Sequence, residues 1–121
     1  MSDQPKLPRG GGPVSGHTRT LDLLGRLWTV VFEKGVLYID DKEVQGSCEE
    51  HKQALRISGK LCREAQRSTL LHEIRHAFDI MIHGEHPSDE ELCVRTTEMG
   101  MYHFLRAPIN KWALAFIQED S

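Results

Sequence analysis

The chain has 121 residues and a mass of 13.8 kDa, which is the size of a single domain. With 39% hydrophobic and 27% charged residues, its composition excludes collagen-like, low-complexity and wholly disordered proteins. The formal net charge of -3 provides no general attraction to nucleic acid or to anionic membranes, so we expect neither as a partner.

Residues 1–20 are predicted to form a disordered tail, because they hold three of the five prolines and four glycines but few large apolar residues. They lack the apolar stretch of a signal peptide, and no apolar run approaches the roughly 18 residues of a membrane span. The three cysteines are odd in number and far apart, which argues against a disulfide framework. We therefore expect a cytoplasmic protein with one domain over residues 21–121.

The first predicted elements are two strands over residues 27–33 and 36–39, joined by a tight turn at Lys34-Gly35. Glycine favours such a turn because it adopts positive φ without strain. A further short strand is predicted over residues 53–58, with residues 44–50 as its candidate partner. These strands predict a small, mostly antiparallel sheet.

The hydrophobic period then changes to that of a helix over residues 64–83, with Gly84 as its expected C-terminal cap. Ser88 and Glu91 form a capping-box pattern that predicts a second helix reaching residue 106, and residues 112–117 predict a short third helix. The predicted fold class is therefore α+β. The apolar stripe of the first helix consists of Leu70, Leu71, Ile74, Ala77, Phe78, Met81 and Ile82.

The first helix contains the motif His72-Glu73-Ile74-Arg75-His76, an H-E-x-x-H pattern. Four residues advance an α-helix by roughly 400°, so both imidazoles leave the same face about 6 Å apart at Cβ and can share one zinc ion. Glu73 is rotated by about 100° from His72, beside the metal, where a general base takes a proton from water. The motif predicts a zinc site with Glu73 as its base.

A hydrolytic zinc site uses three protein ligands and leaves one position for water. A third histidine at the metzincin spacing is excluded, because that position is Ile82. On the second helix Glu91, Glu98 and Tyr102 fall on one face beside the apolar side, where they can point into the interface. We favour Glu91 as third ligand, with Glu90 and Glu98 as alternatives and helix capping as a competing role for Glu91.

Each of the other polar residues near the motif has two possible roles. Asp79 either holds the second nitrogen of a ligand imidazole or is an exposed helix carboxylate. Tyr102 either donates to a developing oxyanion or packs. His83 and His86 are interpreted as loop histidines rather than transition-state donors.

The segment S-T-L-L-H-E-I-R-H-A-F-D over residues 68–79, with residues 89–94 and 102–106, resembles small zincin-like metallopeptidases of bacteriophages and prophages, in a gluzincin arrangement. The resemblance implies a compact zincin-like α+β fold, one zinc ion and proteolysis inside a bacterial cell. It places the zinc ligands on His72, His76 and Glu91 and the catalytic base on Glu73.

The leading hypothesis is a zinc-dependent hydrolase that cleaves peptide bonds in a peptide or protein substrate. In a domain of this size, the substrate would lie along an exposed strand edge above the cleft. The alternative is a non-catalytic binding or regulatory module of phage or prophage origin that keeps zinc for stability. A third hypothesis is a small interaction protein without a metal.

Overall fold

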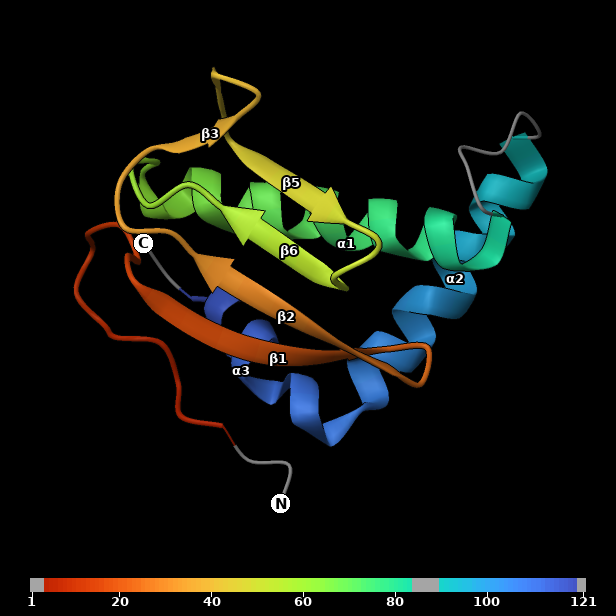
Figure 1. Ribbon diagram of the computed structural model, residues 1–121. Helices are drawn as coiled ribbons and strands as arrows, with labels where there is room; N and C mark the ends of the chain where they lie inside the picture. Colours follow the sequence, from red (N-terminus) through yellow and green to blue (C-terminus); the bar gives the residue numbers. More distant parts are fainter. Residues whose placement is uncertain (1–3, 84–89, 120–121) are drawn as a thin grey trace.

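The protein is a two-layer α+β structure with one face of a small sheet covered by helices (Figure 1). The computed structural model describes residues 4–83 and 90–119, and the side chains of residues 83–97 lie outside this description. The elements in chain order are β1 (His17–Leu23), β2 (Arg26–Phe32), β3 (Leu37–Ile39), β4 (Lys42–Val44), β5 (Gly46–Glu49), β6 (Ala54–Ile57), α1 (Arg63–His83), α2 (Glu90–Arg106), a 3-10 turn (Pro108–Asn110) and α3 (Lys111–Ile117).

The main sheet has the strand order β1-β2-β6-β5. The β1–β2 and β5–β6 pairs are antiparallel, and the central β2–β6 pair is parallel. The predicted pairing of residues 53–58 with residues 44–50 is therefore confirmed. The sheet is mixed rather than purely antiparallel, because β6 returns beside β2 after the separate β3–β4 hairpin.

The predicted hairpin between residues 27–33 and 36–39 is wrong. The partner of β2 is β1, and the two strands are joined by Leu24 and Gly25, which both have positive φ as a two-residue hairpin loop requires. The Asp22 carboxylate stabilises this turn by accepting a hydrogen bond of 2.8 Å from the Gly25 amide. Gly35 also has positive φ, but its carbonyl accepts a hydrogen bond from Gly59 as the chain leaves the sheet.

The tail predicted over residues 1–20 differs from the structure at several points. Its last four residues form the first half of β1. Leu7 and Val14 are buried in the core, with 5% and 2% of their surface exposed. Gln66 of α1, itself fully buried, donates a hydrogen bond to the Val14 carbonyl and accepts one from the Val14 amide, each of 2.8 Å. These contacts attach the N-terminal segment to the domain.

The helices agree closely with their predicted ranges, because a 3.6-residue period and capping residues are local signals that need little tertiary information. Four residues of the predicted stripe on α1, namely Leu70, Ile74, Ala77 and Phe78, are buried against the sheet and α2. Leu71 and Ile82 are each 38% exposed and lie at the edge of that stripe. Trp112 and Phe116 of α3 pack edge-on against Phe32 of β2 and close the core.

Register decides which residues of the edge strand β5 face the helices. Leu55 and Ile57 of β6 are fully buried, and their partners across the ladder are Cys48 and Gly46 of β5. Directly paired residues share a face of a sheet, so Gly46 and Cys48 face α1, which runs behind β5 and β6 in Figure 1. In the described part of the chain, no helix is long and apolar enough to cross a membrane.

Candidate metal centre

The two histidines of the motif converge at the middle of α1. Their Nε2 atoms are 2.9 Å apart, and their rings meet edge-on with centroids 4.5 Å apart and planes at 82°. His72 is exposed and His76 is half-buried. The two nitrogens are therefore directed at one small region of space that solvent can reach.

This geometry fits a zinc ion. Two nitrogens bound to one tetrahedral zinc at about 2.0–2.1 Å lie about 3.3 Å from each other. The observed 2.9 Å is the distance of a hydrogen bond between the two rings and is a few tenths of an ångström shorter than that separation. Among the described side chains, no third His, Cys, Asp or Glu completes a ligand set with this pair.

Glu73 lies on the adjacent, inward side of α1. Only 5% of the residue is exposed. Burial raises the pKa of the Glu73 carboxyl above its ordinary value, and the smaller effect of the neighbouring His72 lowers it. A carboxylate with a raised pKa holds a proton more readily, which is the property that a general base requires. Glu73 is therefore a buried carboxyl next to His72, and its role as general base stays a prediction.

Gly46 of β5 leaves space for the carboxylate of Glu73, because glycine has no side chain. A Cβ atom at this glycine would lie 3.1 Å from Glu73 Oε2 and 2.6 Å from Thr69 Cγ2. Any larger residue would therefore push β5 away from α1 or displace the carboxylate. The close approach of strand and helix at this point depends on the missing side chain.

A cavity of about 580 Å³ connects these groups. At its Cys48 side the pKa of the thiol is raised to about 12, first by burial and then by the charges of Glu73, Glu50 and Glu49. The cavity is lined by Gly46, Cys48, His72, Glu73, His76, Asp79 and Ile80.

The remaining predicted site residues have different outcomes. Asp79 is 5% exposed and lines the cavity, so the reading as an exposed carboxylate is wrong. Glu98 is exposed, and Tyr102 is 67% exposed with the Arg106 guanidinium 5.4 Å from its ring centroid. Neither points into the interface as predicted, because α2 packs on α1 through its opposite face.

That packing face is defined by Gly100 and Phe104. A Cβ atom at Gly100 would lie 2.6–2.8 Å from the Phe78 ring, so the glycine lets α2 lie directly on α1. Phe104, one turn later, is 1% exposed. The side chains of Glu90, Glu91 and His83, and all of Gly84, His86 and Ser88, fall outside the described residues, and the expectations for them stay predictions.

Sequence reasoning missed the contribution of β5, namely Gly46 and Cys48. One local signal was present, because an isolated glycine at the start of a strand often marks a close approach of two backbones. Comparisons with protein-family models, with curated proteins and with solved structures give no match to this chain.

Proposed function

We propose that this protein is a zinc-dependent hydrolase that cleaves peptide bonds, with His72 and His76 as metal ligands and Glu73 as general base. The observation that carries the proposal is the 2.9 Å approach of the two Nε2 atoms at a cavity shared with a buried carboxylate of raised pKa. A helix that carried these residues only as a solvated face would not bury Glu73 to 5% exposure.

Within this proposal each residue has a separate task. The imidazoles would hold the ion, and zinc bound there would supply Lewis acidity that lowers the pKa of water and polarises a carbonyl. Glu73 accepts the proton from water and later delivers it to the leaving amine. Burial keeps the Glu73 carboxyl in a dry environment with a raised pKa, which supports both transfers.

The position of β5 supports an extended peptide as substrate. In the described sheet β5 is an edge strand, paired with β6 on one side only. Its Gly46 and Cys48 line the cavity beside Glu73. An extended peptide that adds to this edge through backbone hydrogen bonds would pass the cavity. We propose the cytoplasm as the compartment.

Glu91 remains our proposed third ligand. The direct test compares zinc dissociation constants of Glu90→Ala, Glu91→Ala and Glu98→Ala. We expect a large loss for Glu91→Ala and little change for Glu98→Ala, since Glu98 is exposed and absent from the lining of the cavity. Wild-type affinity in Glu91→Ala, together with a loss in either neighbour, would reject this assignment. Unchanged zinc affinity in all three variants would place the third ligand elsewhere.

The function itself is tested by measuring zinc content and peptide cleavage for wild type and Glu73→Gln. The isosteric amide cannot accept the proton, so we expect zinc binding to be kept and turnover to fall by about 10²–10⁴-fold. Equal rates in both proteins would exclude Glu73 as the base. Stoichiometric zinc without any cleavage by wild type would favour the stabilised binding module, and a protein without zinc would exclude both.

A further inference from the structure

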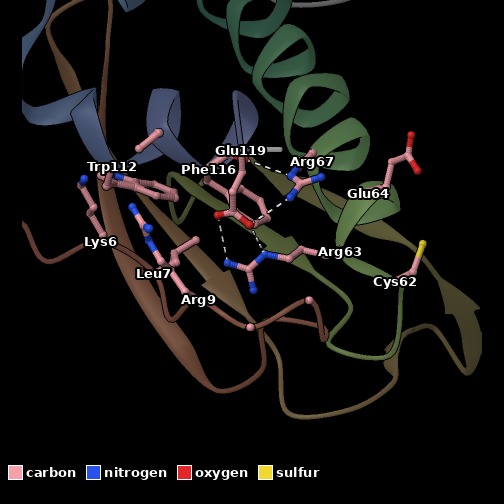
Figure 2. A pocket seen from close by; sticks show the side chains of 13 residues that line it. Lys6, Leu7, Arg9, Cys62, Arg63, Glu64, Arg67, Trp112, Phe116 and Glu119 are labelled. Atoms are coloured by element: carbon pink, nitrogen blue, oxygen red, sulfur yellow. Dashed lines mark hydrogen bonds and ion pairs between the residues drawn. The ribbon is translucent and has the colours of Figure 1, made fainter. Parts of the chain in front are cut away.

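A second cavity lies at the N-terminal end of α1, away from the histidine motif. It measures about 770 Å³, within the range of about 300–1,000 Å³ that is typical of small-molecule sites. It shares no lining residue with the cavity at His72 and Glu73. Figure 2 shows the residues that line it, which are Lys6, Leu7, Arg9, Gly10, Gly11, Cys62, Arg63, Glu64, Arg67, Trp112, Ala115, Phe116 and Glu119.

Two buried arginines, Arg63 and Arg67, line this cavity, with 6% and 9% of their surface exposed. Both donate hydrogen bonds to the carboxylate of Glu119, Arg63 through Nε and Nη2 and Arg67 through Nη2. Their planes also lie near the Phe116 ring, at 5.4 and 5.7 Å from its centroid. Among the described residues, Glu119 is the one carboxylate paired with these two guanidiniums, which also donate hydrogen bonds to the backbone carbonyls of Pro8, Gly12 and Phe116.

The rim adds further positive charge. Lys6 and Arg9 are exposed, and their side chains make no hydrogen bond or ion pair with any residue that the structure describes. The only other carboxylate in the lining, Glu64, points away from the Arg63–Glu119 pair in Figure 2. Among the described residues that line the cavity, Lys6, Arg9, Arg63 and Arg67 therefore outnumber the carboxylates Glu64 and Glu119.

Apolar side chains also line the cavity, and one of them, Phe116, lies beside the two guanidiniums. Leu7 comes from the N-terminal segment, and Trp112, Ala115 and Phe116 come from α3. A ligand that interacts with both the cationic and the apolar side chains must carry an anionic group and an apolar body. The cavity already binds one carboxylate, that of Glu119. Arg63 donates two hydrogen bonds to it, one to each oxygen, which is the geometry that favours planar acids.

We propose that this cavity binds a small organic acid, with the carboxylate of the ligand held by the excess cations and its apolar body against the wall formed by Leu7, Trp112 and Phe116. The site is separate from the proposed metal centre, so its occupancy does not depend on zinc.

The test measures binding of 4-phenylbutyrate to the full chain by isothermal titration calorimetry. 4-Phenylbutylamine has the same apolar body with the opposite charge, and acetate has the charge without the body. We expect one site for phenylbutyrate and at least about tenfold weaker binding of both controls, since each lacks one of the two interactions. Equal binding of the amine or of acetate would overturn the proposal, as would the absence of phenylbutyrate binding to wild type.

Variants locate the site. The double variant Lys6→Ala/Arg9→Ala removes two exposed side chains without a described partner, so folding is preserved, and we expect affinity to fall about fivefold. Arg26→Ala, an exposed arginine on β2, is the matched control and should bind like wild type. His72→Ala should also bind like wild type. Unchanged affinity in the double variant, or loss in His72→Ala, would show that the acid binds elsewhere and would reject the proposal.

Discussion

Gly46→Ala tests the close approach of β5 to α1 on which the candidate site depends. The added methyl would lie 2.6 Å from Thr69 Cγ2, 3.0 Å from the Arg56 carbonyl oxygen and 3.1 Å from Glu73 Oε2. Overpacking of this kind costs about 1–3 kcal/mol, whereas replacing glycine at an unstrained position gains about 0.4–1 kcal/mol from the unfolded chain. The clash dominates, so urea denaturation should show a net loss of about 1–2 kcal/mol in the free energy of unfolding.

The same variant should reduce peptide cleavage by about 10–100-fold, because a displaced Glu73 no longer has the productive geometry. Gly12→Ala is the matched control, since its added Cβ meets nothing within 4 Å and its φ is not positive. Thr69→Ser removes the methyl that makes the closest contact but leaves the contacts with the Arg56 carbonyl oxygen and Glu73, so the double variant with Gly46→Ala should recover part of the lost stability. Wild-type stability in Gly46→Ala, or no rescue by Thr69→Ser, would refute the packing derived for β5.

Three further predictions follow from other contacts. His72→Ala and His76→Ala should each lose stoichiometric zinc in elemental analysis, because each removes one of the two converging nitrogens; retention of zinc in both would exclude the site. Glu119→Gln should lower the free energy of unfolding by about 2 kcal/mol at pH 7, since the carboxylate accepts charged hydrogen bonds from two buried guanidiniums. These bonds hold the pKa of Glu119 below its ordinary value, so its stabilising contribution is complete above the ordinary glutamate range and declines as the pH falls through the lowered pKa. Urea titrations should show a smaller gap between wild type and variant at pH 3, and a gap independent of pH would contradict the ion pair. Gly100→Ala should destabilise the protein by about 1–3 kcal/mol in thermal or urea unfolding, because its methyl meets the Phe78 ring at 2.6–2.8 Å; a helical propensity gain alone would give the opposite sign.

The helices were predictable because their information is local. On α1, apolar residues recur every three to four positions, and the buried residues Leu70, Ile74 and Phe78 follow that period. The pairing of the two histidines is equally local, since it depends only on a four-residue spacing and helix geometry.

Strand partners were less predictable, because pairing is a choice between segments far apart in the sequence. A run of β-formers followed by Lys34-Gly35 looks the same whether the chain turns back at once or leaves the sheet. The actual partner of β2 was hidden in β1, whose polar residues and nearby glycines and prolines resemble a tail. Its burial depends on contacts with α3, such as the hydrogen bond from Trp112 to the Thr20 carbonyl.

For the candidate site, the sequence by itself determined the spacing of His72 and His76 and the place of Glu73 one residue along the helix. Only the tertiary structure decided that β5 faces this helix, that Glu73 and Asp79 are buried, and that Glu98 and Tyr102 point outward. The reason is physical: helix geometry is set by contacts three or four residues apart, whereas burial and pKa depend on which distant surfaces pack together.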